Sequence, residues 1–357
     1  MGEGTASFPF KRRFTPGMNN SISDVSGVSV GHVTLDDGPI QTGVTAILPH
    51  RGDLFSEKPA AACHVINGFG KSTGLLQIRE MGAVETPIIL TNTLSVGTAY
   101  SGIVRHMLER NGRIGRETGT VNPIVCECND GYLNDIRALS VTEEHVEEAL
   151  ARASGAEGKT FARGAVGAGR GMSCYQLKGG IGTASRAIPL PEGAYTLGAL
   201  VLTNFGLYED FLWDGKPLAE SVSAPPPIPW KDMGSVIVVL AIDAPLSDRQ
   251  LGRLSRRAVS GLARTGAYIA SGSGEIVLAF STGRKVPHEP PREPPPERTV
   301  HEDRLDDFFL ASTEAVEEAV LDSLLSAETV TGRDGHVRYA LRDLLEKRIS
   351  EAADDVN

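Results

Sequence analysis

The sequence contains no long apolar run, no excess of positive charge and few cysteines. No stretch of roughly 18 apolar residues occurs in the 357-residue chain, so we expect no membrane-spanning segment. The formal charge is -10, and an acidic surface repels phosphate backbones, so nucleic acid is not an expected partner. Residues 1–20 include basic side chains but no apolar segment after them, which argues against a secretory signal and favours a cytoplasmic protein with a flexible tail.

The motifs of several common enzyme classes are also absent. The eight histidines form no H-x-x-x-H or H-E-x-x-H pair, so a zinc hydrolase would lack its ligands, and no G-x-S-x-G elbow occurs. Gly70-Lys71-Ser72 resembles the end of a P-loop, but Val65 stands where the first glycine is needed. The glycine-rich segment 164–171 lacks G-x-G-x-x-G spacing and predicts a tight turn between closely packed backbones.

The four cysteines are Cys63, Cys126, Cys128 and Cys174. Only Cys126 and Cys128 are close in sequence, and one C-x-C pair supplies at most half of a zinc site. We therefore expect reduced and mostly buried thiols, and neither a metal nor a cofactor.

Hydrophobic residues make up 41% of the chain and charged residues 22%, which is typical of a globular protein with a sizeable core. Capping boxes are predicted from Ser140 with Glu143 and from Ser247 with Gln250. The six prolines of 286–298 indicate an extended surface loop. Hydrophobic periodicity predicts strands within 22–49 and at 87–91, 195–203, 235–242 and 275–281, and helices at 101–110, 142–154, 247–265, 303–327 and 338–352. Because strands and helices mix without strict βαβ alternation, the pattern favours a layered α+β fold in which helices cover a pair of sheets.

One serine stands at an unusual junction. Ser235 begins the apolar run 235–242, which should be a central strand covered on both faces, and it follows a proline-rich linker at 224–230. Taken alone, Gly234-Ser235 is only the start of a strand.

A series of further motifs changes this interpretation. They occur in a fixed order along the chain, at 22–32, 42–47, 67–74, 91–93, 129–135, 178–186, 203–206, 234–235, 243–245 and 271–275. With these motifs the chain resembles the L-aminopeptidase/D-alanyl-esterase-amidases and the β-peptidyl aminopeptidases, from about residue 20 to about residue 350. The resemblance implies a four-layer αββα sandwich of the N-terminal-nucleophile hydrolase type.

The resemblance also implies a precursor that cuts itself before a serine. Here the single domain 21–357 would be cut between Gly234 and Ser235, leaving fragments 1–234 and 235–357 that stay together, and relatives form tetramers of such pairs. Cleavage would free an α-amine with a pKa near about 7.7–8.0 beside the Ser235 hydroxyl, which suits a general base. Gly234 would permit the strained backbone that an N-to-O acyl shift requires.

The remaining site residues follow from the resemblance as well. Ser273 and Glu275 would be the second and third catalytic groups, on one face of an extended strand. Asn204 would donate to the oxyanion, although a turn-forming asparagine is the alternative. Tyr132 would line the site or else be a core tyrosine, and the substrate's ammonium would pair with Glu127 or Asp130.

The function that follows is a serine aminopeptidase or amidase that removes N-terminal residues from small peptides, amides or esters. Two alternatives remain open. One is an acyltransferase similar to the ornithine acetyltransferases, which use a threonine where this chain has Ser235, and the other is a non-catalytic binding homologue. The sequence does not reveal whether L-α-, D- or β-residues are preferred.

Overall fold

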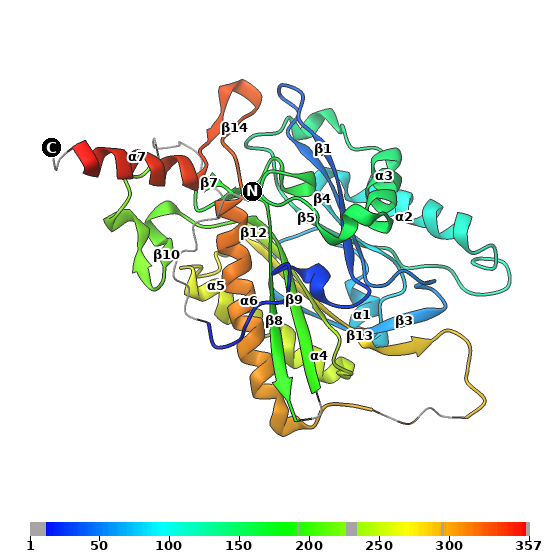
Figure 1. Cartoon of the computed structure of the whole chain (residues 1–357). Helices are drawn as coiled ribbons and strands as arrows, with labels where there is room; N and C mark the ends of the chain where they lie inside the picture. The colour runs from blue at the N-terminus through cyan, green and yellow to red at the C-terminus, as the bar shows by residue number, and fades with distance from the viewer. Residues whose placement is uncertain (1–11, 192, 226–233, 294–295, 297, 355–357) are drawn as a thin grey trace.

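Two β-sheets pack face to face with helices on both outer sides, in a computed structural model that describes residues 12–191, 193–225, 234–293, 296 and 298–354 (Figure 1). Side chains are described as far as residue 347. This arrangement confirms the four-layer αββα sandwich. Residues 1–11 of the predicted tail and 226–233 around the predicted linker lie outside the described part of the chain.

The first sheet has the order β1 (Ser29–Leu35), β2 (Thr42–Leu48), β4 (Ile88–Asn92) and β5 (Ile124–Cys128). The pairs β1–β2 and β2–β4 are antiparallel, whereas β4 and β5 are parallel. Its outer face is covered by α2 (Val96–Arg110) and α3 (Glu143–Ser154), whose apolar residues form one cluster with Val44, Ala46 and Ile89.

The second sheet has the order β3 (Glu57–Gly68), β13 (Gly274–Pro287), β12 (Ser235–Ile242), β9 (Gly193–Asn204) and β8 (Ile181–Leu190). β12 is the central strand, parallel to β13 and antiparallel to β9, and all eight of its residues are buried. The structure therefore confirms the predicted central position of 235–242.

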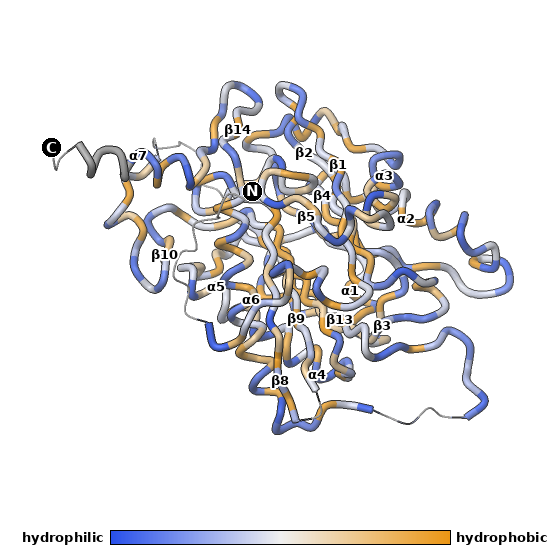
Figure 2. The backbone as a smooth tube through the Cα atoms, viewed as in Figure 1, coloured by the Kyte–Doolittle hydropathy of each residue, from blue (hydrophilic) through white to orange (hydrophobic). Residues whose placement is uncertain are grey.

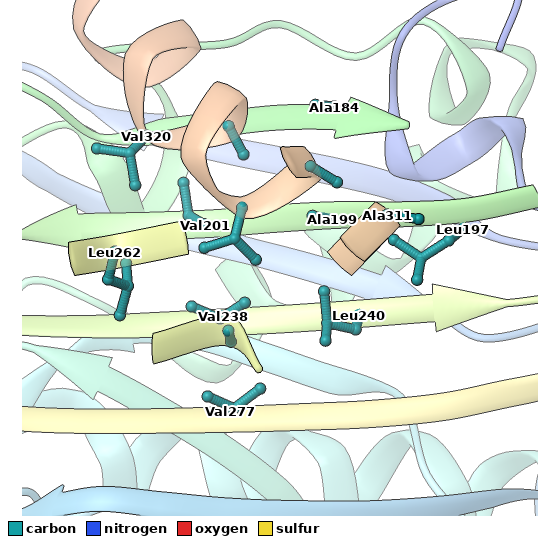
Figure 3. Packing of buried hydrophobic residues seen from close by; sticks show 14 of the residues in the cluster. Ala184, Leu197, Ala199, Val201, Val238, Leu240, Leu262, Val277, Ala311 and Val320 are labelled. Carbon is teal, nitrogen blue, oxygen red and sulfur yellow. The ribbon is translucent and has the colours of Figure 1, made fainter. Parts of the chain in front are cut away.

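The residues of β12 alternate between two apolar cores, as a strand covered on both faces requires. Val236, Val238 and Leu240 pack toward the helices, whereas Ile237 and Val239 pack between the sheets. Figure 3 shows the helix-side core, in which Val238 and Leu240 of β12 lie with side chains from the neighbouring strands and helices. In Figure 2 the apolar backbone colours concentrate in the interior of these layers.

Three helices cover the second sheet: α4 (Asp248–Ser255), α5 (Ala258–Arg264) and α6 (Leu305–Leu325). The single helix predicted over 247–265 is therefore wrong, although its capping box of Ser247 and Gln250 is confirmed. A short-range bond from Arg257 N to Leu254 O tightens the backbone between α4 and α5. Beyond it, Gly261 packs so closely against α6 that an added Cβ would lie 2.6 Å from Thr313 O.

The cap predicted from Ser140 and Glu143 is also wrong. The N-cap of α3 is Thr142, two residues later, and its partner at the third helical position is His145. His145 Nδ1 accepts from Thr142 N at 3.1 Å, so an imidazole takes the part that a glutamate usually plays.

The proline-rich segment 286–298 is partly strand, because β13 continues to Pro287 before the chain leaves the sheet. The glycine-rich segment is a tight turn as predicted, and a Cβ on Gly164 would lie 2.4 Å from Ser326 O. Besides short 3-10 turns, the other described elements are the α-helices α1 (Leu75–Met81) and α7 (Leu341–Asp354) and the two-residue strands β6 (Ser173–Cys174), β7 (Leu177–Lys178), β10 (Leu212–Trp213), β11 (Lys216–Pro217), β14 (Val330–Thr331) and β15 (Val337–Arg338).

The four cysteines are free thiols, and all but the partly exposed Cys63 are buried. Across the described residues, no group of three or more His, Cys, Asp or Glu side chains is placed to hold a metal ion. The described helices include none with the length and apolar character needed to cross a membrane.

Candidate active site

The Gly234–Ser235 peptide lies where the chain enters the central strand. Gly234 has φ +68°, a left-handed conformation that favours glycine, and Ser235 is the first residue of β12. The Ser235 hydroxyl donates to the carbonyl oxygen of Gly234 at 2.6 Å. The side-chain oxygen of Ser235 is thus held beside the carbonyl group of the preceding residue.

Asn204 ends β9 directly opposite Ser235 in the antiparallel ladder, so the two side chains share a face of the sheet. Its Oδ1 accepts from Ser173 N at 2.9 Å, and its Nδ2 donates to Asn129 O at 3.0 Å. These two contacts fix the orientation of the amide. The second Nδ2 hydrogen has no partner among the described residues and can serve another acceptor.

Ser273 and Glu275 approach from the opposite face. Glu275 is the ladder partner of Val236, so it points toward the helix-covered side, and Ser273 precedes it by two residues. Burial raises the pKa of Glu275, and a hydrogen bond with the Ser273 side chain partly offsets this. An added Cβ on Gly234 would lie 3.1 Å from Ser273 Oγ, so this hydroxyl lies against the residue that precedes Ser235.

The structure therefore brings the four predicted catalytic residues to one end of β12, but from two sides. Ser235 and Asn204 face the space between the sheets, whereas Ser273 and Glu275 face the helices. The Gly234–Ser235 peptide is where the two sides meet.

A small pocket opens on the helix side of this peptide, with a volume of about 40 Å³. Apolar residues form much of its wall, while the Ser273 hydroxyl and the Glu275 carboxyl group stand beside Gly234. The lining includes Phe205, Gly234, Leu262, Ile269, Ser273 and Glu275.

Glu127 is near the end of β5 and is buried. One carboxylate oxygen accepts from Lys71 N at 2.8 Å, and the other accepts from the Thr93 hydroxyl. A Cβ on Gly70 would lie 3.4 Å from Glu127 Oε1 and 3.9 Å from Ile276 Cδ1, so this loop separates the carboxylate from β13. No cationic side chain forms an ion pair with Glu127 within the described residues.

Asp130 is fully buried, and its side chain contacts other residues than that of Glu127 does. Its Oδ1 accepts from Asn134 Nδ2 at 3.1 Å, and its Cβ lies 2.7 Å from where a Cβ on Gly171 would stand. Burial raises its pKa to about 7. The structure brings neither Glu127 nor Asp130 into the lining of the pocket beside Gly234.

Tyr132 packs against His336, which precedes β15, and against Arg338 of β15. Its ring stacks on His336 with centroids 4.6 Å apart, and the Arg338 guanidinium carbon lies 3.6 Å from the ring centroid. Arg338 Nε in turn donates to Ser173 Oγ at 2.7 Å. Tyr132 therefore connects to the backbone that holds Asn204, but it does not line the pocket.

Two residues that hold Asn204 have no role in the sequence-based prediction. Asn129 is the first residue of the motif at 129–135, whereas Ser173 belongs to none of the ordered motifs. Both act through backbone atoms, which any residue type carries, so no side-chain signal could have identified them.

Comparison with known proteins decides the family. The sequence model of peptidase family S58 matches residues 20–338, which is most of the chain. The chain belongs to peptidase family S58. It is accordingly a peptide hydrolase by family, as the ordered motifs predicted.

Relatives of this S58 peptidase extend over nearly its whole length. The β-peptidyl aminopeptidase BapA of Sphingosinicella microcystinivorans is 36% identical over 360 residues, covering 93% of this chain and 89% of that protein. A β-aminopeptidase structure from Burkholderia sp. superimposes with a TM-score of 0.86 at 40% identity, covering 95% of both chains. The L-aminopeptidase D-Ala-esterase/amidase of Ochrobactrum anthropi, described as a variant of the Ntn-hydrolase fold, matches with a TM-score of 0.86 at 34% identity, covering 97% of both. These matches confirm the predicted family and fold.

Proposed function

We propose that this S58 peptidase cuts itself between Gly234 and Ser235 and then acts as a serine aminopeptidase or amidase through Ser235. The observation that carries the proposal is the 2.6 Å contact of the Ser235 hydroxyl with the Gly234 carbonyl at the start of a buried central strand. This contact supports self-cleavage because the nucleophile already lies beside the bond to be broken.

Self-cleavage would proceed as an N-to-O acyl shift. Ser235 Oγ attacks the Gly234 carbonyl carbon, the hydroxyl proton passes to the Ser235 nitrogen, and the C–N bond breaks to leave an ester. Water then hydrolyses the ester, giving a Gly234 carboxylate and a Ser235 with a free α-amine and hydroxyl. The left-handed backbone at Gly234 and the adjacent Ser273 hydroxyl support this route.

In the cut enzyme the α-amine of Ser235 would take the proton from Oγ as it attacks a substrate carbonyl. The second Nδ2 hydrogen of Asn204 would donate to the oxyanion. The tetrahedral intermediate then collapses as the bond from the carbonyl carbon to the substrate's amine or alcohol breaks, and Ser273, positioned by Glu275, would relay the proton to that leaving group. The acyl-enzyme is then hydrolysed by water, which releases the N-terminal residue.

The substrates we propose are small peptides, amides or esters with a free N-terminus. Glu127 supports this, because it is a buried carboxylate that no described cation neutralises, and a substrate ammonium would supply the missing charge. The Sphingosinicella and Ochrobactrum relatives are named for related activities on such compounds. A cytoplasmic location and an assembly of cleaved pairs into a homo-oligomer belong to the same proposal.

A denaturing gel with intact-mass measurement tests the proposal. Wild type should give fragments 1–234 and 235–357, and Ser235→Ala should remain one chain without activity toward aminoacyl p-nitroanilides. Ser255→Ala is the matched control, since Ser255 is another buried serine whose hydroxyl donates to a backbone carbonyl, that of Gly252 at 3.1 Å. An active wild type that stays uncut would refute the mechanism. Release of free acid, rather than transfer to an added amine, separates hydrolysis from acyl transfer.

A further inference from the structure

The loop from Gly266 to Ser273 joins α5 to β13 and forms part of the pocket wall. It starts at Gly266, where an added Cβ would lie 1.8 Å from Asp210 O. It then passes through Ile269 at φ +62°, a left-handed conformation that is costly for a β-branched residue. Such a conformation persists only where surrounding contacts enforce it, so the loop needs an anchor before it delivers Ser273.

The side chain of Asn67, on β3, provides that anchor. The two hydrogens of its Nδ2 are shared among three carbonyl oxygens, those of Ala270 at 3.2 Å, Ser271 at 3.1 Å and Ser273. Because all three neighbours are acceptors, the nitrogen of the amide must face them. No other side chain bonds these three carbonyls within the described residues. A bond from Ser273 N to Ala270 O at 3.0 Å closes the same turn.

The sheet determines where Asn67 stands. Asn67 is the ladder partner of Glu275, and the β3–β13 register shifts immediately after this pair. Asn67 and Glu275 therefore lie on the same side of the sheet as the turn that carries Ser273. Asn67 belongs to the proposed fragment 1–234, whereas Ser273 belongs to 235–357, so cleavage would make this an interaction between two chains.

We propose that Asn67 is a positioning residue, which fixes the Ala270–Ser273 turn so that the Ser273 hydroxyl stays against the Gly234–Ser235 peptide. This inference rests on the proposed role of Ser273. Asn67→Asp keeps the shape of the side chain, removes both N–H donors and sets a carboxylate oxygen against three carbonyl oxygens. Asn67→Ala removes the anchor without adding repulsion.

The experiment measures self-cleavage rate, kcat, KM and thermal midpoint for wild type, Asn67→Asp, Asn67→Ala, Ser273→Ala and the double variant Asn67→Ala/Ser273→Ala. Each Asn67 variant should slow self-cleavage and lower kcat by about ten- to a hundred-fold, with KM changed less than about two-fold. The double variant should be as slow as Ser273→Ala alone, because both changes remove the same function. Asn111→Ala is the matched control, since Asn111 is also half-buried and also bonds loop backbone, accepting from Arg113 N at 3.1 Å.

The outcomes separate this inference from the proposed function. If Ser273→Ala keeps full activity, the proposed role of Ser273 fails. If Ser273→Ala is impaired but the folded Asn67 variants match wild type, the proposed function stands and only the positioning role is lost. If the effects of the Asn67 and Ser273 changes on activity are additive, Asn67 acts on stability alone. The same conclusion follows if the Asn67 variants and Asn111→Ala lose activity to the same extent for the same fall in thermal midpoint. If Asn67→Asp does not fold, the same comparisons are made with Asn67→Ala and then Asn67→Ser.

Discussion

Ser235 on β12 and Asn204 on β9 are ladder partners in the second sheet. Their side chains point to the same side, into the space between the two sheets, and both residues are buried. Val236, the next residue of β12, has Glu275 on β13 as its ladder partner. The side chain of Glu275 points to the opposite side of the sheet, toward the helices. The proposed nucleophile and its proposed oxyanion donor are thus placed by the β9–β12 pair, and Glu275 of the proposed proton relay is placed by the β12–β13 pair.

Asn204→Ala should lower kcat by about a hundred-fold or more, because removing one oxyanion donor has an effect of that size. It should also destabilise the fold, since Ser173 N loses its acceptor and Asn129 O its donor. Asn204→Asp separates the two effects, because its carboxylate still accepts from Ser173 N but cannot donate. Steady-state kinetics and thermal melts check this, and wild-type kcat in a folded Asn204→Asp enzyme would remove Asn204 from catalysis.

Gly234→Ala should slow self-cleavage by more than the strain of placing an alanine in the left-handed conformation of residue 234 would cause by itself. Its Cβ would lie 3.1 Å from Ser273 Oγ and 3.2 Å from Phe205 Cβ, so the groups around the Gly234–Ser235 peptide must shift by a few tenths of an ångström. Gly215→Ala is the control, since Gly215 has a similar φ of +73° but open space around its Cβ position. Both should cost roughly 1 kcal/mol in left-handed strain, but only Gly234→Ala should delay the appearance of the two fragments on a time-course gel. Equal cleavage rates in the two variants would show that the close packing at Gly234 is irrelevant.

The sequence predicted much of the fold because the spacing of apolar residues follows the positions that are buried in each strand and helix. The run 235–242 has no polar interruption, and it is the central strand of the sheet. The break between α4 and α5 left no such signal, since the residues between them, Arg256 and Arg257, are both good helix formers. Periodicity also could not show that Ser235 and Glu275 lie on opposite faces, because that depends on the register between strands.

Glu127→Gln should raise KM for substrates with a free ammonium, by about ten-fold or more, because a buried charged hydrogen bond is lost. The KM for the matching substrate that lacks the amine should not change. Asp130→Asn is the control, since Asp130 is the other predicted counter-charge and its carboxylate already accepts a hydrogen bond from Asn134. Kinetics with the paired substrates check this, and a KM effect confined to Asp130→Asn would reverse the assignment.

Glu275→Gln should make the protein more stable at neutral pH while lowering its activity. Burial raises the pKa of Glu275, with the Ser273 hydrogen bond as a partial offset, so the folded state binds the proton more tightly than the unfolded chain does. Stability therefore falls as the pH rises from the ordinary value of 4.5 through the raised pKa, and the ionised carboxylate remains a cost above it. The glutamine has no charge to bury, so its advantage in thermal midpoint should be present at pH 7.5 and absent at pH 4.

Glu85→Gln should shift the thermal midpoint at pH 7.5 in the opposite direction to Glu275→Gln. Burial alone would raise the pKa of Glu85, but hydrogen bonds with Lys58, Gln77 and Asn122 outweigh it and lower the pKa. The contribution of Glu85 is thus present above its ordinary pKa and is lost as the pH falls, so Glu85→Gln should lower the thermal midpoint at pH 7.5 and change it less at pH 4. If Glu275→Gln lowers the midpoint at pH 7.5, as Glu85→Gln is expected to do, then the ionised carboxylate of Glu275 does not destabilise the fold.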